Sequence, residues 1–282
     1  MISVNPMQLK AIVRNKAKES GISAQLVMQN YVMERFLERI AISDYKQNLI
    51  LKGGFLIAAI VGLDARATMD MDATARGFSF THESLGNVFE KICSLSVPDN
   101  ISFICNRISD IREGSGYPGL RVHLTANYPP LAIPLVIDVT TGDKIMPHEI
   151  EFTYKLLFEE RTITVMAYNL ETILAEKIET VLSRSIANTR PRDFYDIYIL
   201  NALCSVECDM STLKQALTET AKQRTSGHIF EEYREVISAV RNSSQMKAFW
   251  DKYRRDYNYA KDVTFDEVCE SVLSLMDNIL QY

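Results

Sequence analysis

The sequence has no long hydrophobic run. Its most apolar stretches, 55–63 and 131–139, are shorter than the ~20 residues that a helix needs to cross a bilayer, and its first residues carry no signal-peptide core. Its cysteines number five, an odd count without the paired spacing of a metal site. We therefore expect a reduced, cytoplasmic protein with no membrane partner and no structural zinc.

An excess of basic residues is also lacking. Lys and Arg total 31 against 36 Asp and Glu, so the formal net charge is −5. A chain of this charge has no overall basic field for nucleic acid, although local basic patches remain possible. Its 282 residues, 47% of them apolar, are enough for a sizeable core and, at this length, for two domains.

The first 168 residues combine helical and strand-like patterns. Apolar residues recur at helical spacing through the first fifty, with Ser23 as a candidate N-cap, and 55–63 is typical of a short buried helix. From 68 to 168, short runs rich in β-branched and aromatic residues predict strands, with one helical segment after Thr81. The glycines and proline of 114–119 predict a turn.

After Asn169, a candidate N-cap, the strand-like runs stop and the pattern becomes helical throughout. Further amphipathic segments are predicted around 211–223, 228–241 and 264–280. We therefore predict an α+β fold in which 1–168 form N-terminal helices and a mixed sheet with flanking helices, and 169–282 form an all-helical C-terminal domain.

Two aspartates in TMDMD are candidate metal ligands. In a strand, Asp70 and Asp72 point to one face with their Cα atoms about 6.5–7 Å apart. Such a pair can converge on one Mg²⁺, which takes one or two carboxylates and completes its shell with water and phosphate oxygens. The alternative is a solvated strand face with two unrelated aspartates, and for this motif alone it is the simpler interpretation.

The residues around these aspartates favour phosphate binding. Gly53 and Gly54 precede a helix, so a phosphate could approach the backbone N–H groups at the positive end of its dipole. The alternative is a plain C-cap and turn between two helices. Lys52 could add a charge or lie at the surface. Arg66 and Thr68 precede Asp70, and the Thr68 hydroxyl could bond a phosphate or hold a carboxylate in place.

A third carboxylate, Asp138, interrupts the apolar run PLVIDV and needs a partner there. A metal shared with Asp70 and Asp72 would supply one, and a hydrogen bond to nearby backbone is the equal alternative.

The helical half contains a second polar group. Lys177 lies on an apolar stripe, which requires it to snorkel or to meet an anion, and Arg184 lies on the same face. Arg192, Asp193 and Asp196 fall within about one helical turn. An Arg192–Asp196 salt bridge is the structural interpretation. The functional one is that these groups orient Lys177 and a nucleotide, or act as a general base.

The chain resembles the AbiEii/AbiGii nucleotidyltransferase toxins, which are similar to DNA polymerase β-type nucleotidyltransferases. The resemblance rests on an ordered set of motifs that spans about 48–202: LKGG, RATMDMD, VIDV, LAEKIETVLSR and RPRDFYDIYIL. The resemblance implies a nucleotidyltransferase-type sheet and transfer of a nucleoside monophosphate from an NTP with Mg²⁺ or Mn²⁺. Thr68 stands where many relatives have serine, and Gly-Gly where the wider superfamily often has Gly-Ser.

Carried over residue by residue, the resemblance assigns the metal to Asp70, Asp72 and Asp138. It assigns catalytic roles to these three together with Lys177, Asp193 and Asp196. Nucleotide and phosphate binding would fall to Lys52, Gly53, Gly54, Arg66, Thr68, Lys177, Arg184 and Arg192.

The implied partner is RNA, most simply the 3′ end of tRNA, whose modification would block translation or growth in a toxin–antitoxin and phage-defence system. An antitoxin encoded beside the toxin need not touch it. Lys177, Arg184, Arg190 and Arg192 could form a local basic groove for RNA. The alternatives are a protein or small-molecule acceptor, or a catalytically idle nucleotide-binding regulator. The complete carboxylate set argues against the idle protein.

Overall fold

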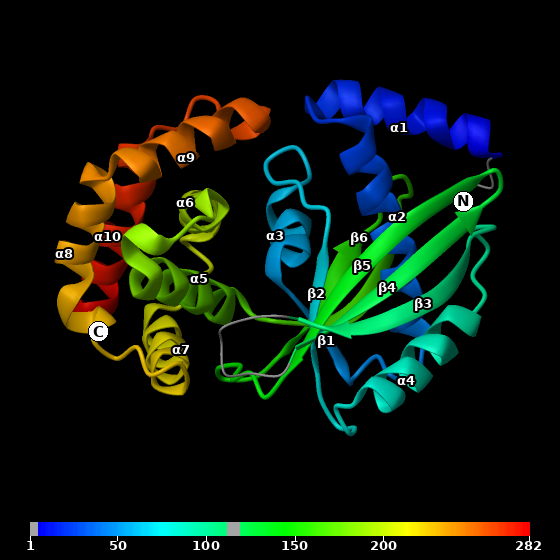
Figure 1. The fold of residues 1–282 in the computed structure, drawn as a ribbon, viewed down its shortest axis with the longest axis horizontal. Helices are drawn as coiled ribbons and strands as arrows, with labels where there is room; N and C mark the ends of the chain where they lie inside the picture. The colour runs from blue at the N-terminus through cyan, green and yellow to red at the C-terminus, as the bar shows by residue number, and fades with distance from the viewer. Residues whose placement is uncertain (1–4, 112–118) are drawn as a thin grey trace. The chain divides into compact units, whose positions relative to one another are not determined.

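A computed structural model describes residues 5–111 and 119–282 (Figure 1). The chain divides into two compact units. The first comprises Met1–Asp143 with Glu149–Ala167, and the second comprises Lys144–His148 with Tyr168–Tyr282. Within the described ranges no helix is long and apolar enough to cross a membrane. The turn expected at 114–119 lies, apart from Gly119, outside the described residues.

The first unit is built on a mixed sheet. Among the described residues the sheet has seven strands in the order β3-β4-β5-β2-β1-β7-β6. The pairs β2/β5 and β1/β7 are parallel and the others antiparallel. The strands are β1 (Leu49–Lys52), β2 (Met71–Ala75), β3 (Ser102–Asp110), β4 (Gly119–Tyr128), β5 (Leu131–Thr141), β6 (Ile150–Lys155) and β7 (Thr162–Ala167). The predicted α+β class is thereby confirmed, although β1 and β6 were not expected.

Four helices belong to this unit in the described part of the chain: α1 (Pro6–Ser20), α2 (Ala24–Ile42), α3 (Gly53–Val61) and α4 (His82–Ser94). The Ser23 and Thr81 hydroxyls accept hydrogen bonds from the backbone N–H groups of Leu26 and Ser84, so both predicted helix starts are confirmed. Helix α3 follows β1 directly, because Gly53 takes a left-handed conformation with φ +67° and turns the chain out of the strand.

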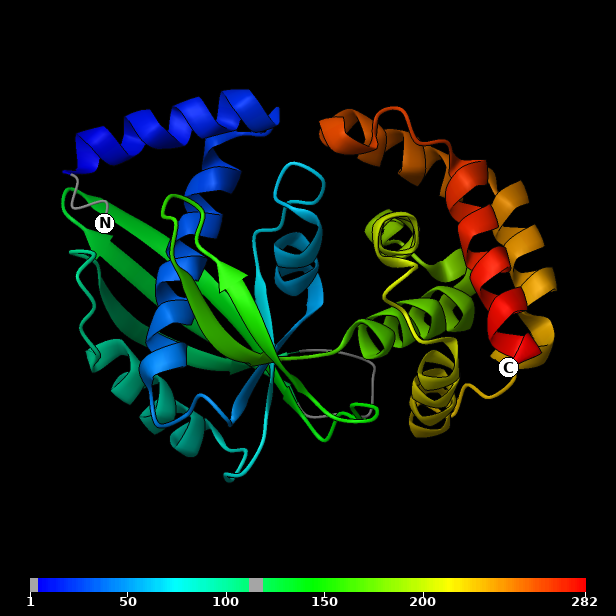
Figure 2. The same cartoon turned by 180° about the vertical axis from the view of Figure 1, so that it is seen from behind.

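One face of the sheet is covered by α2 and α4. Phe36 of α2 stacks on Phe89 of α4 and meets Phe103 of β3 edge-on, with ring centroids 5.8 Å and 5.1 Å away. Figures 1 and 2, taken from opposite sides, show α2 running along this face. Along β4, alternate residues from Leu120 to Ala126 are buried against it. The intervening residues of β4 therefore point to the opposite face.

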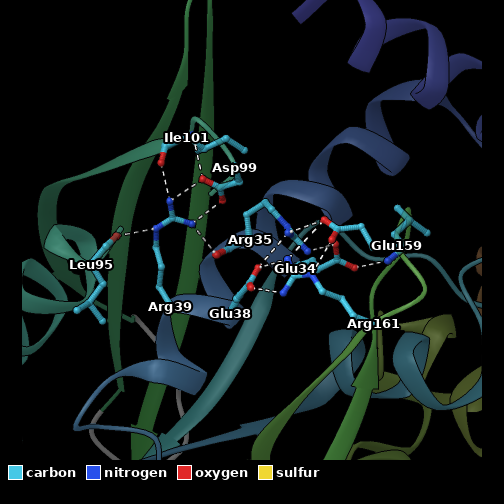
Figure 3. A network of polar contacts seen from close by, with 10 residues as sticks. Glu34, Arg35, Glu38, Arg39, Leu95, Asp99, Ile101, Glu159 and Arg161 are labelled. Atoms are coloured by element: carbon cyan, nitrogen blue, oxygen red, sulfur yellow. Dashed lines mark hydrogen bonds and ion pairs between the residues drawn. The ribbon is translucent and has the colours of Figure 1, made fainter. Parts of the chain in front are cut away.

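Helix α2 is also tied to the first unit by buried ion pairs (Figure 3). Arg39 donates to both oxygens of Asp99, at 2.8 Å and 2.9 Å. Arg35 pairs with Glu34 at 2.6 Å and with Glu38 at 2.9 Å, and Arg161 of β6–β7 also reaches Glu38. These charges replace apolar packing on part of α2, and they hold the helix in one position on the sheet.

The second unit is helical throughout its described residues apart from connecting segments. Its α-helices are α5 (Leu170–Arg184), α6 (Pro191–Cys204), α7 (Met210–Gln223), α8 (Ile229–Asn242), α9 (Ser244–Asp256) and α10 (Phe265–Gln281). Asn169 caps α5 as predicted, accepting from the Thr172 N–H at 2.9 Å. Helix α5 packs against α6, α7 and α8, and its apolar stripe is buried among them. Helix α9 was not predicted, since only Met246, Trp250 and Tyr253 of its thirteen residues are buried.

Candidate active site

Four charged side chains lie in one row across four neighbouring strands. Lys52 of β1 is aligned with Asp72 of β2, Asp72 with Asp138 of β5, and Asp138 with Arg121 of β4. Residues aligned across a sheet point to the same face. We call Lys52, Asp72, Asp138 and Arg121 the charged row. It lies on the face opposite α2 and α4, where the start of α3 approaches Asp72.

Asp70 lies next to the charged row, but not in the strand where it was predicted. Strand β2 begins at Met71, and Asp70 is one residue before it. Its charge still acts on Arg121, together with the charges of Asp72 and Asp138. The structure thus brings the three predicted carboxylates to one neighbourhood of the sheet.

Arg121 holds the third carboxylate. Its Nε donates to Oδ1 of Asp138 and its Nη2 to Oδ2, both at 2.7 Å, so the pair is bidentate. The hydrogen bonds to Asp138 raise the pKa of Arg121, and the charges of Asp138, Asp70 and Asp72 add to them, against a smaller opposing effect of desolvation. The partner expected for Asp138 from sequence was a metal or backbone, and in the structure it is an arginine.

Lys52 is held at the other end of the row. Its Nζ donates to Oδ2 of Asp143 at 2.8 Å and to Oγ1 of Thr140 at 2.7 Å, while Oγ1 of Thr74 donates to Asp143 at 2.7 Å. Burial works to raise the pKa of Asp143. The charge of Lys52 and the hydrogen bonds from Lys52, Thr140 and Thr74 outweigh burial, so this pKa lies below its ordinary value. The ammonium is therefore fixed against Asp143 and Thr140, and phosphate binding by Lys52 stays a prediction.

The two glycines are required by their neighbours. A Cβ on Gly53 would lie 2.1 Å from Oδ2 of Asp72, and a Cβ on Gly54 would lie 3.0 Å from Nη2 of Arg66 and 3.2 Å from Oγ1 of Thr68. The alternative of a C-cap between two helices is wrong, because β1 precedes the turn and α3 follows it. The start of α3 thus lies directly against Asp72, Arg66 and Thr68.

Thr68 and Arg66 make local contacts here. Oγ1 of Thr68 is 3.5 Å from the backbone N of Asp70, and the Arg66 guanidinium donates to the carbonyl of Ala67. Both side chains are buried, at 7% and 3% exposure. They shape the segment that delivers Asp70, and their predicted contact with a nucleotide stays a prediction.

The oxygen donors of this face suit a hard divalent cation. Mg²⁺ takes one or two carboxylates along with water and phosphate oxygens, and Asp70 and Asp72 can supply them. Within 5–111 and 119–282, however, no three Asp, Glu, His or Cys side chains converge as a ligand set. Both oxygens of Asp138, the candidate third ligand, already accept hydrogen bonds from Arg121. The residues therefore fit Mg²⁺ through two carboxylates as they stand.

In the helical unit, Lys177 meets two carboxylates. Its Nζ lies 2.7 Å from Oδ1 of Asp193 and 2.8 Å from Oδ2 of Asp196, so one cation joins α5 to α6. Burial works to lower the pKa of Lys177, but the charges of both aspartates and their hydrogen bonds raise it above its ordinary value. Of the two alternatives for Lys177 on the apolar stripe, snorkelling or meeting an anion, the structure shows the second. Arg184 and Arg192 are exposed.

The mixed sheet, the glycine turn against Asp72 and the neighbouring Asp138 are the features expected of a nucleotidyltransferase-type fold. The fold is similar to that of a candidate nucleotidyltransferase from H. pylori, with a TM-score of 0.53 and 15% identity over 92% of this chain and 98% of that one. JHP933 from Helicobacter pylori is also similar, with a TM-score of 0.48 and 16% identity over 92% of each chain. No curated protein sequence matches the chain.

The family described as "Nucleotidyl transferase AbiEii toxin, Type IV TA system" matches residues 35–271. The chain belongs to this family, as the ordered motifs indicated. It is therefore a nucleotidyltransferase of a toxin–antitoxin system.

Sequence reasoning missed Arg121 and Asp143 as members of this site. A signal for Arg121 exists, since Pro129 and Pro130 mark the tip of a hairpin in which Tyr128 pairs with Leu131. Counting back from that tip places residue 121 opposite Asp138. Asp143 has no comparable signal, because it follows the end of β5 and its contact with Lys52 depends on the order of the strands.

Proposed function

We propose that this nucleotidyltransferase transfers a nucleoside monophosphate from an NTP to RNA, at the 3′ end of tRNA, and thereby stops translation. The observation that carries this proposal is the contact between the glycine turn and the charged row. Phosphates bound at the start of α3 would lie beside Asp72, because a Cβ at Gly53 would already collide with that carboxylate.

The reaction is a substitution at the α-phosphorus. A hydroxyl oxygen of the acceptor forms a bond to this phosphorus, the bond from the phosphorus to the oxygen bridging to the β-phosphate breaks, and pyrophosphate leaves. The proton of the hydroxyl passes to a carboxylate of the charged row. The chain positions the reactants through the backbone N–H groups of Gly53 and Gly54 and the dipole of α3, which favour the triphosphate at this position.

Asp70, Asp72 and Asp138 would hold Mg²⁺ or Mn²⁺. When bound, the ion neutralises charge on the phosphates and makes the acceptor oxygen more nucleophilic. In the helical unit, Lys177, Asp193 and Asp196 keep their proposed catalytic role, with the two aspartates orienting the lysine.

The acceptor and partners follow from charge and chemistry. Arg184 and Arg192 are exposed and would contact RNA phosphates locally, although the whole chain is acidic. NTPs and tRNA are cytoplasmic, so we place the protein there, with a role in phage defence. An antitoxin encoded beside it completes the system and need not touch the toxin.

A labelling assay tests the reaction. The protein is incubated with Mg²⁺, total RNA and each α-³²P-labelled NTP in turn, and RNA is separated by size. Label should enter the tRNA band and should be lost with EDTA or with Asp72→Asn. Asp110→Asn is the matched control, because Asp110 is an exposed aspartate on β3 of the same sheet.

Label in protein or in a small molecule, with none in RNA, would replace the RNA acceptor by another. Absence of both transfer and Mg²⁺–NTP binding would overturn the enzymatic proposal altogether.

A further inference from the structure

The Arg121–Asp138 pair sets a condition on how the charged row can work. Both oxygens of Asp138 accept hydrogen bonds from one guanidinium, at 2.7 Å each. A bidentate arginine matches the geometry of a carboxylate and holds it strongly. A divalent cation at Asp138 would therefore meet oxygens that Arg121 already holds, and the positive charge of Arg121 would oppose it.

Three features make the Arg121 side chain suited to exchange Asp138 for another anion. Its side chain is 43% exposed, whereas that of Asp138 is 20% exposed, so the guanidinium lies at the surface of the pair. It projects from β4, next to the strand of Asp138, toward the face that carries Asp70 and Asp72. A guanidinium also matches phosphate oxygens with two parallel N–H donors.

We propose that Arg121 is an exchangeable counter-ion of Asp138. On binding of a metal–NTP complex it gives up Asp138 and donates its hydrogen bonds to the triphosphate. The proposal rests on the proposed function and deepens it, since Arg121 becomes a nucleotide-binding residue and a positioning residue for the third carboxylate. Without nucleotide, Arg121 limits metal binding at the row, and with nucleotide it strengthens binding.

Two affinities with opposite expected changes test this exchange. Mn²⁺ binding is measured by electron paramagnetic resonance without nucleotide, and binding of a non-hydrolysable NTP analogue with Mg²⁺ is measured by calorimetry. Arg121→Gln should bind Mn²⁺ several-fold more tightly than the unmodified chain. Its affinity for the analogue should fall about tenfold or more, since a hydrogen bond to a charged group contributes about 1.5–3 kcal/mol.

Three further variants control for folding and charge. Arg121→Lys keeps the charge but lacks the planar pair of donors, and it should fall between the unmodified chain and Arg121→Gln in both affinities. Arg107→Gln removes an exposed charge from β3 of the same sheet and should change neither. With Asp138→Asn already in place, Arg121→Gln should no longer raise the Mn²⁺ affinity.

Unchanged or weaker Mn²⁺ binding by Arg121→Gln, with native circular dichroism, would overturn the exchange. So would analogue binding that does not depend on Arg121. If the unmodified chain binds Mg²⁺–analogue and loses it with Asp72→Asn, the proposed nucleotide site stands whatever Arg121 does. If neither the unmodified chain nor Arg121→Gln binds metal or analogue, both proposals fail.

Discussion

Gly53 shows how one residue can serve both the backbone and the site. Its φ of +67° is a conformation that L side chains rarely adopt, and the space beside it is occupied by Oδ2 of Asp72. A Cβ atom at position 53 would therefore both strain the turn and displace Asp72, a proposed metal ligand. The neighbouring Gly54 has ordinary backbone geometry and is limited only by Arg66 and Thr68.

Gly53→Ala should abolish Mg²⁺–NTP binding and destabilise the chain, because the left-handed conformation alone costs an L residue about 1–2 kcal/mol and the collision with Asp72 adds to this. Gly86→Ala is the control. Gly86 lies within helix α4, and a Cβ there would lie 3.7 Å from the Ile108 side chain of β3. The substitution should therefore be neutral or slightly stabilising. Urea unfolding and calorimetry give both quantities, and equal behaviour of the two variants would contradict this account.

Helix α2 carries a glutamate whose pKa is raised by burial. Burial raises the pKa of Glu34 to about 7, against the charge of Arg35 and the hydrogen bond from the Leu157 N–H. The same side chain contacts Arg35 at 2.6 Å. A buried charged network can therefore stabilise one placement of a helix while part of it titrates near neutral pH.

The pH dependence of stability follows from this shift. The unfolded pKa is the model-peptide value of 4.5, so between that pH and about 7 the folded chain binds more protons than the unfolded one. The stabilising contribution is full below the unfolded value and is lost as pH rises through the folded value. The free energy of unfolding of the unmodified chain, minus that of Glu34→Gln, should fall between about pH 5 and 8.

Urea unfolding across this pH range gives the difference. Glu83→Gln is the control, because Glu83 is exposed in the first turn of α4. The difference in unfolding free energy between Glu83→Gln and the unmodified chain should not change with pH over this range. A difference for Glu34→Gln that also does not change with pH would show that Glu34 does not titrate in this range.

The ammonium of Lys177 joins α5 to α6 through Asp193 and Asp196, and Asp193 also pairs with Arg190 at 3.3 Å. Lys177→Met would leave Asp193 and Asp196, whose side chains are 1% and 0% exposed, buried without their ammonium. Breaking a buried ion pair in this way should cost about 3–5 kcal/mol of unfolding free energy. Fluorescence of Trp250, the only tryptophan, reports on this helical unit during urea unfolding.

Lys222→Met on α7 removes an exposed lysine and should have little effect. Adding Asp196→Asn to Lys177→Met should recover part of the lost stability, because it removes one buried charge. Loss of stability that is equal in Lys222→Met would contradict a specific role for Lys177.

Across the whole molecule, an acidic chain is proposed to act on an acidic polymer. With a net charge of −5, attraction to RNA must come from local groups. Arg184 follows the apolar stripe of α5 and Arg192 opens α6, and both are exposed. Each would neutralise about one phosphate and release its counter-ions.

The double variant Arg184→Ala with Arg192→Ala should therefore weaken tRNA binding. The slope of the logarithm of the binding constant against the logarithm of the salt concentration should become shallower by about two. Fluorescence anisotropy with labelled tRNA at several KCl concentrations measures both. Arg14→Ala with Lys18→Ala removes the same charge from exposed positions of α1 and is the control. Equal losses in the two double variants would indicate a general charge effect instead of a local site.

Much of the architecture and the family could be predicted because they depend on local pattern. Short runs rich in β-branched and aromatic residues indicated most strands. Caps at Ser23, Thr81 and Asn169 marked three helix starts, and the ordered motifs indicated a nucleotidyltransferase. Strand β1 has only four residues and β6 is mostly exposed, so neither carries a clear alternation. Helix α9 buries too few apolar residues to show its period.

The candidate residues were found by type and spacing, but their partners were not. The sequence determined that Asp72 and Asp138 belong to strands, that Asp138 needs a partner there, and that Lys177 must snorkel or meet an anion. Only the tertiary structure decided that Arg121 holds Asp138, that Asp143 holds Lys52, and that Glu34 is buried among arginines. The reason is physical: period and residue type determine the direction of a side chain, whereas the charge it meets depends on register and strand order across distant segments.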